Sequence, residues 1–284
     1  MRLFRVVAAL LLGAAGLAPP PAEAWGLAGH RMVEEQAIEI LPEPLRAAFR
    51  AKGAQISDWA VEPDTVLRAR YGRKEEVKHF IDLDLYGRPP FAGLPRSYRA
   101  AVARFGAEVV RERGTVPWTI ERMHARLVRE LRAGDWAKAL ETAAHGGHYV
   151  ADATMPLHAV SDYDGRASAS PGIHKAVEHD LVDAHLARFV RRVRRAVEPA
   201  RASDYARGRV FDVLAESYAA VPELLDADHR ARRLGRVGSP AYVEALDRGA
   251  GSTVAARLVR AVQFLGAYWL SAWEEAGRPP PPGS

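Results

Sequence analysis

Apolar residues recur at helical spacing along most of this chain. Between Trp25 and Pro42 they return every three or four residues, which predicts a first helix that the proline ends. Pro117 sits where a first-turn proline belongs, and Asp135 is a predicted N-cap. The same criteria predict further helices over residues 45–51, 98–113, 117–132, 135–153, 173–190, 203–219, 240–246 and 253–275.

The remaining segments are short. Residues 55–70 predict a bend followed by a helical turn, and residues 87–95 and 161–172 predict loops. Residues 78–84 predict an extended segment, in which alternation places His79, Ile81 and Leu83 on one face. No repeat, linker or composition break divides the chain. The pattern predicts an all-α fold with one domain over residues 25–276 and a disordered tail over residues 277–284.

The first 24 residues have the pattern of a secretory signal peptide. Arg2 and Arg5 supply a basic start, an apolar run of about thirteen residues follows, and Ala22-Glu23-Ala24 is a small-x-small cleavage signal. The apolar run is too short to span a bilayer as a helix. We expect cleavage after Ala24, a mature chain that begins at Trp25, and a secreted or periplasmic location.

The composition bears on what stabilises the fold and on what the protein binds. The chain has no cysteine, so an exported protein of this size depends on its apolar core or on metal rather than on disulfides. The formal charge of +5 comes from arginines scattered among acids. This surplus fits an anionic substrate such as a phosphodiester, a lipid surface or a nucleic acid. An arginine-rich genome would give the same count.

The strongest candidate for chemistry is the segment 145–158, HGGHYVADATMPLH. His148 and Asp152 are four residues apart, so on a helix they project from the same face. Pro156 ends that helix and turns His158 back toward it. Two imidazoles and a carboxylate in so short a span indicate a metal site. The alternative is an ordinary solvated helix face.

Other candidate ligands lie on both sides of this segment. His174 and Glu178 form a second pair at a spacing of four residues, and Asp64 and His79 bracket a loop. His30 follows the predicted mature N-terminus by five residues. Neutral imidazoles and carboxylates suit Zn²⁺ in a chain without thiols.

With these motifs the chain resembles a known family: the zinc-dependent phospholipases C of bacteria and their relatives, the single-strand-specific zinc nucleases and 3'-nucleotidases of fungi and plants. The resemblance extends from Trp25 to about Glu178. Its motifs, present here in order, are the tryptophan exposed by processing, an early histidine, a spaced Asp and His, H-x-x-x-D-x-x-x-x-x-H ending in Pro-Leu-His, and H-x-x-x-[DE].

The resemblance implies a compact all-α domain with a cleft that holds three zinc ions. It implies a zinc-activated hydroxide that attacks a phosphodiester in line, with Asp152 bridging the first and third ions and Asp64 placed to orient the water or take its proton. By the same resemblance the first zinc is held by Asp64, His79, His148 and Asp152, the second by His158, His174 and Glu178, and the third by His30 with the amine and carbonyl of Trp25.

Three assignments have alternatives. Asp58 could replace Asp64, although the shorter separation of Asp64 from His79 is more like the family. His145 is interpreted as a neighbour of the ligands or a surface residue rather than as a ligand. Arg68 could contact a substrate phosphate, although a solvated arginine is the favoured interpretation.

The sequence features that bear on the substrate point to different branches of this family. The acid at Glu178 and the spacing of His158 from His174 are more like the phospholipases, whereas the short separation of Trp25 from His30 is more like the nucleases. We expect a monomeric phospholipase C-like hydrolase that contacts a membrane surface transiently and has no transmembrane segment. A nuclease or 3'-nucleotidase acting on single-stranded nucleic acid is one alternative, and a non-catalytic zinc-binding protein is another.

Overall fold

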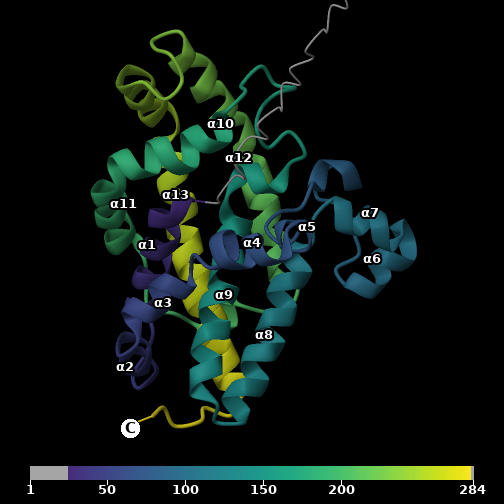
Figure 1. Cartoon of the computed structure of the whole chain (residues 1–284), viewed down its shortest axis with the longest axis vertical. Coiled ribbons are helices and arrows are strands. Elements are labelled where there is room, and N and C mark those ends of the chain that lie inside the picture. Colours follow the sequence, from purple (N-terminus) through teal and green to yellow (C-terminus); the bar gives the residue numbers. More distant parts are fainter. Residues whose placement is uncertain (1–24, 283–284) are drawn as a thin grey trace, which may run out of the picture.

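The structure, a computed structural model, describes residues 25–282, so the predicted signal peptide lies outside the described residues. Between these limits the chain is helical and contains no β-strand, which confirms the all-α prediction. Figure 1 shows α13 running through the middle of the molecule with the other long helices around it. The long helices are α1 (Gly26–Glu39), α8 (Val116–Arg132), α9 (Trp136–Thr154), α11 (Val182–Ala196), α12 (Arg209–Arg232) and α13 (Pro240–Glu275).

Short helices and turns connect these elements. In chain order they are α2 (Leu45–Arg50), α3 (Gly53–Trp59), the π-helical turn η1 (Pro63–Leu67), α4 (Arg68–Tyr71), α5 (Arg73–Glu76), the 3₁₀ turn η2 (Leu83–Tyr86), α6 (Tyr98–Phe105), α7 (Ala107–Glu112), the 3₁₀ turn η3 (Pro156–Ala159), α10 (Ile173–Lys175), the π-helical turn η4 (Ala176–Leu181) and the 3₁₀ turn η5 (Ala202–Asp204).

Helix α13 forms the centre of the core. It packs against α1, α8, α9, α11 and α12. Its residues Leu258, Val262, Leu265 and Trp269 are buried, and at helical spacing they present one apolar face to these neighbours. Burial of this face against α9 fixes the helix that carries the central candidate ligands.

The prediction of two helices over residues 240–246 and 253–275 is wrong, because α13 is continuous. Gly249 and Gly251 lie between the two predicted helices. A Cβ at Gly249 would lie 2.7 Å from the Cβ of Ala227 on α12. This glycine therefore permits close helix packing instead of ending the helix.

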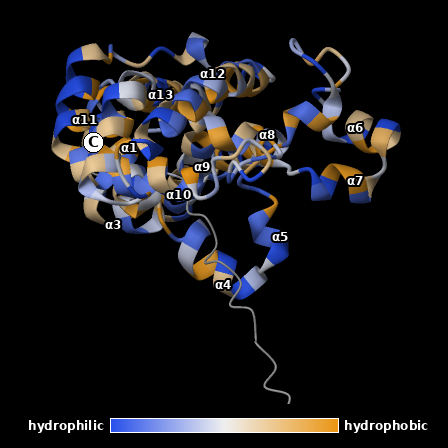
Figure 2. Cartoon of the chain, turned by 90° about the horizontal axis from the view of Figure 1, so that it is seen from above, coloured by the Kyte–Doolittle hydropathy of each residue, from blue (hydrophilic) through white to orange (hydrophobic). Residues whose placement is uncertain are grey.

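Three other helix boundaries differ from prediction. The helix predicted over residues 173–190 continues to Ala196 and is divided into α10, η4 and α11. The predicted helix over residues 98–113 is divided into α6 and α7 at Gly106, whose φ of 88° is outside the helical region. Figures 1 and 2 both show this helix pair set apart from the main bundle. The helix predicted over residues 203–219 instead begins at Arg209, after the short turn η5, and continues to Arg232.

The extended segment predicted over residues 78–84 is shorter in the structure, because Leu83 and Asp84 already belong to the 3₁₀ turn η2. His79, Ile81 and Leu83 are buried, the residues between them are partly exposed, and residues 80–82 are not helical. The backbone N–H of Ile81 donates to the carbonyl of His158 at 2.9 Å. This bond holds the segment against the end of α9 and η3.

The tail differs from the prediction of disorder as far as the structure describes it, to residue 282. The indole N–H groups of Trp273 and Trp136 donate to the carbonyls of Pro279 and Pro280, at 2.9 and 3.0 Å. The two indoles therefore hold the start of the tail against α13 and α9. Within the described part of the chain, no helix has the length and apolar character needed to cross a membrane.

Candidate metal centre

The fold brings residues from six separate segments into one buried cluster. All are less than one-tenth exposed, and the helical spacing of two pairs places them on shared faces. The cluster, called the central cluster below, comprises His30 on α1, Asp64 on η1, His79 in the extended segment, His148 and Asp152 on α9, His158 on η3, and His174 and Glu178 on α10 and η4.

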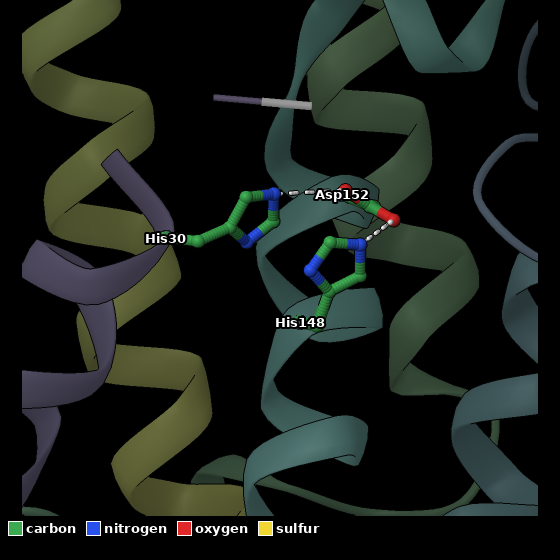
Figure 3. Close-up of side chains that lie close together, drawn as sticks. All are labelled: His30, His148 and Asp152. Atoms are coloured by element: carbon green, nitrogen blue, oxygen red, sulfur yellow. Dashed lines mark ion pairs between the residues drawn. The ribbon is translucent and has the colours of Figure 1, made fainter. Parts of the chain in front are cut away.

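Asp152 lies at the middle of the central cluster. Its Oδ1 is 3.5 Å from Nε2 of His30, and its Oδ2 is 3.4 Å from Nε2 of His148 and 2.9 Å from Nδ1 of His79. In Figure 3 the imidazoles of His30 and His148, from α1 and α9, both point toward this carboxylate. One carboxylate thus faces three imidazoles, as a bridging ligand would.

Asp152 also provides a test of whether the cluster fits a metal ion. The residue is fully buried, yet neither carboxylate oxygen accepts a hydrogen bond from any residue between 25 and 282. Burial and the nearby carboxylates of Asp64 and Glu178 raise the pKa of Asp152 well above its usual range. A buried acid beside other acids is expected where a cation balances their charge, so these residues fit a metal ion.

Asp64, the favoured of the two candidate aspartates, lies in this cluster. Its Oδ1 is 3.5 Å from Nδ1 of His79, and its Oδ2 is 3.7 Å from Nε2 of His148. The side chain of Asp58 is 77% exposed and pairs with Arg31 on the surface. The structure therefore brings Asp64, and not Asp58, to the other predicted ligands.

Arg68 is not solvated, so the favoured interpretation of that residue is wrong. Its side chain is 10% exposed, and Nη2 lies 2.7 Å from Oδ1 of Asp64. The guanidinium places a positive charge beside a carboxylate of the cluster, which favours the ionised form that a metal ligand needs.

The second predicted group is equally compact. Oε1 of Glu178 lies 2.6 Å from Nε2 of His174 and 3.2 Å from Nε2 of His158, and the two imidazole nitrogens are 3.0 Å apart. His158 Nδ1 is 3.9 Å from Oδ1 of Asp152, so this group adjoins the one around Asp152. These two histidines and one glutamate could together hold one metal ion.

Backbone carbonyls orient two of the imidazoles. Nδ1 of His148 donates to the carbonyl of Ala60 at 2.8 Å, and Nδ1 of His158 donates to the carbonyl of His79 at 2.8 Å. Because Nδ1 carries the proton in each ring, Nε2 presents its lone pair to the carboxylates. This arrangement is typical of metal-binding histidines, whose second nitrogen is fixed by a hydrogen bond.

The charge states of the imidazoles agree with this role. Burial lowers the pKa of His79 and His148 well below the usual range, and the neighbouring imidazoles and Arg68 lower it further. Burial also lowers the pKa of His174 to about 3 and raises that of Glu178. The imidazoles are therefore neutral near pH 7, which is the form that binds metal.

Two candidate ligands lie in π-helical turns. Asp64 is in η1 and Glu178 is in η4, and in both turns the wider winding changes which side chains face inward. Sequence spacing indicated the pair of His174 and Glu178 but not the change in helix type. Such turns recur at functional sites.

Trp25 lies at the edge of the central cluster. Its indole is buried and donates to the carbonyl of Ala151 at 2.9 Å and to Oγ1 of Thr154 at 3.3 Å. Its backbone N–H is close enough to Glu178 to lower the pKa of that carboxylate. The indole thus holds the Trp25 backbone beside the predicted ligands.

Glu75, which was not among the predicted site residues, supports His79 from behind. Glu75 is buried, and one of its oxygens lies 3.8 Å from Nε2 of His79. The same carboxylate accepts hydrogen bonds from the hydroxyl of Tyr149 and from Lys78. The four-residue spacing of Glu75 and His79 was the only signal in the sequence.

A separate group lies one turn before His148 on α9. Nε2 of His145 is 2.9 Å from Oε2 of Glu62, and Glu141 contributes a third potential ligand atom. His145 is buried rather than on the surface, and it contacts a carboxylate. Glu62 and Glu141 were not among the predicted ligands.

No family model matches this chain, and no curated protein matches it. The resemblance to zinc-dependent phospholipases C and nucleases therefore rests on the motifs and their arrangement. The structure brings together His30, Asp64, His79, His148, Asp152, His158, His174 and Glu178, with Trp25 beside them. It defines a group of buried side chains that could hold metal ions.

Proposed function

We propose that this protein is an exported zinc-dependent phosphodiester hydrolase of the phospholipase C type. The observation that carries the proposal is the convergence of the motif residues. The resemblance designates the side chains of the central cluster, from His30 to Glu178, as ligands. They come from six segments, yet they form one buried cluster around Asp152. A solvated helix face would not bury these side chains.

Zinc fits the donor set best. The cluster offers imidazoles and carboxylates and no thiolate, and its histidines are neutral near pH 7. Zinc ions bound there would make hydroxide available near neutral pH and neutralise charge on the phosphate oxygens. Asp152 faces three imidazoles and is suited to bridge two ions.

Asp64 is the residue suited to orient the attacking water. Its carboxylate lies within 3.7 Å of both His79 and His148, and Arg68 forms an ion pair with its Oδ1 at 2.7 Å. This ion pair favours a fixed, ionised carboxylate that accepts a hydrogen bond from water. Asp64 is thus proposed to position the nucleophile.

Exposed apolar side chains that follow Asp64 in the sequence favour a lipid substrate. Val66, two residues after Asp64, is 54% exposed, and Tyr71 on the neighbouring α4 is 50% exposed. Exposed apolar groups in the segment that carries Asp64 suit contact with a membrane surface. We therefore propose a phospholipid as the substrate.

One observation favours the nuclease alternative. The ring of Tyr163 is 5.4 Å from that of His174, measured between centroids, and its side chain is 50% exposed. An exposed aromatic ring beside the cluster could stack on a nucleobase. Both substrates would use the same metal ligands.

An assay of several substrates tests the proposal. Purified protein beginning at Trp25 would be assayed on phosphatidylcholine vesicles, single-stranded DNA and RNA, and a 3'-mononucleotide, with chelator and after zinc is restored. We expect zinc-dependent hydrolysis of the lipid, loss of activity in His174→Ala, and retention in the control His185→Ala. Activity on nucleic acid or on the 3'-nucleotide would favour the alternative. Zinc binding without hydrolysis would leave a non-catalytic zinc-binding protein.

The position of Trp25 supports a second proposal, that processing completes the site. The indole is clamped to Ala151 and Thr154, on the turn of α9 that carries Asp152. An α-amine can bind zinc there only after cleavage at Ala24. A chain with one extra residue before Trp25 should bind one zinc ion fewer and lose most activity. Full activity in that chain would refute this role of the amine.

A further inference from the structure

The group of Glu62, Glu141 and His145 lies outside the central cluster. One potential ligand atom from each residue lies within 4.8 Å of the other two. Glu141 and His145 are four residues apart on α9, and Glu62 reaches them from the segment just before η1. His145 is 8% exposed, whereas both glutamates are partly exposed and reach solvent.

The charges of this group are not balanced within the chain. Among residues 25–282, no lysine or arginine forms an ion pair with Glu62 or Glu141. Some other carboxylates are paired with arginines, as Glu39 is with Arg50 on the surface and Asp247 is with Arg188. Two carboxylates this close repel each other, and a cation between them removes the repulsion.

We propose that Glu62, Glu141 and His145 bind a divalent cation, with Zn²⁺ as the preferred ion. Two carboxylates and one imidazole supply three ligands, and water from the exposed side completes a four-coordinate site. The donor set lacks thiols and contains one nitrogen, which suits zinc better than calcium or magnesium. This site is separate from the central cluster and does not depend on the proposed hydrolase activity.

The ion would fasten the segment that carries Asp64 to α9. Nδ1 of His148 donates to the carbonyl of Ala60, and His145 contacts Glu62. Residues 60–64 are therefore attached to two consecutive turns of α9. A cation on Glu62, Glu141 and His145 would strengthen the outer of these two attachments. We assign it a structural role.

Zinc stoichiometry tests this site. The mature protein would be stripped with chelator, dialysed to equilibrium against Zn²⁺, and analysed for bound metal by mass spectrometry. Glu141→Gln and Glu62→Gln should each bind one zinc ion fewer per chain than the wild type. The control Glu223→Gln, on the exposed face of α12, should bind as many as the wild type.

Two variants keep the test decisive. Glu141 accepts no hydrogen bond from the described residues, so Glu141→Gln breaks no contact and is expected to unfold in chelator at the wild-type temperature or above it, because one of the two repelling charges is gone. Glu62→Gln provides an independent measure. Equal zinc counts in the wild type and both variants would overturn the proposed site. A deficit of one ion would support it even if the protein hydrolysed no phosphodiester, so the two proposals fail separately.

Discussion

Replacing Asp152 by asparagine tests two properties of the central cluster separately. One is how far its charges destabilise the protein without metal, and the other is how far bound zinc stabilises it. The substitution preserves the shape of the side chain and removes its charge. Asp152 is fully buried, and its oxygens accept no hydrogen bond from residues 25–282, so the substitution removes no such bond. We expect Asp152→Asn to stabilise the protein without metal and to weaken its stabilisation by zinc.

The distances give the magnitude. Asp152 Oδ2 and Asp64 Oδ1 lie 2.9 and 3.5 Å from Nδ1 of His79, so these oxygens are at most about 6.4 Å apart. With an effective dielectric constant of about 20, two unit charges at this distance repel by about 2.6 kcal/mol. For a domain of this size, that energy corresponds to a rise in Tm of about 5–10 °C.

The effect has a defined pH dependence. The pKa of Asp152 is raised in the folded protein by burial, Asp64 and Glu178. An acid with a raised pKa holds more protons when folded, so stability is greatest below its unfolded pKa of about 3.9 and falls as pH rises. In chelator, the advantage of Asp152→Asn over the wild type should therefore grow from pH 4 to pH 8.

Thermal unfolding followed by circular dichroism measures both effects. In chelator at pH 8 the variant should have the higher Tm. With zinc at a hundredfold excess over the dissociation constant, each occupied site adds about 2.7 kcal/mol to wild-type stability. The variant should gain less because it lacks the shared ligand. A lower Tm for the variant in chelator, or equal gains with zinc, would refute this reasoning.

Other predictions concern buried groups of the helical core. The pKa of His124 is lowered to about 4 by burial. As pH falls from 6.5 to 4, the unfolded chain therefore binds a proton that the folded chain does not. The free energy of unfolding of the wild type should fall by about 3 kcal/mol over this range, a loss that His124→Gln avoids. Urea unfolding in which both proteins lose the same free energy would contradict this. Gly147→Ala would place a methyl 1.9 Å from Oε1 of Glu34 and should cost about 1–3 kcal/mol. Glu34→Ala in the same chain should recover most of it, and a double-mutant cycle with no coupling would disprove the contact. Arg257→Leu removes a hydrogen bond of 3.0 Å to the carbonyl of Thr154, and the free energy of unfolding should fall by about 3 kcal/mol; a change below about 1 kcal/mol would argue against this role.

The helices were predictable because apolar spacing records which face each helix buries. Glycines limited how well the helix boundaries could be predicted. Gly106 ends a helix through its positive φ, whereas Gly249 lies inside α13 and admits Ala227 of α12. The same residue type breaks one helix and permits close packing in another. The two cases differ in whether another helix packs against the glycine. The spacing of residues in the sequence does not show where that helix lies.

The candidate site was predictable where local spacing carried the information. His148 with Asp152, and His174 with Glu178, are pairs at helical spacing that the structure places within 3.4 and 2.6 Å. The group around Glu62 and His145 was missed because it joins residues 83 positions apart. Contacts of this kind depend on how the bend before η1 meets α9, which no local pattern records.

Anomalous scattering at the zinc absorption edge tests the central claim most directly. Crystals of the chain that begins at Trp25, grown with zinc, would be measured on both sides of the edge. We predict anomalous peaks about 2.0–2.2 Å from the ligand atoms of Asp152 with His148, and of His158 with His174 and Glu178. Zinc-saturated crystals with no peak at these residues would contradict the assignment of a zinc centre.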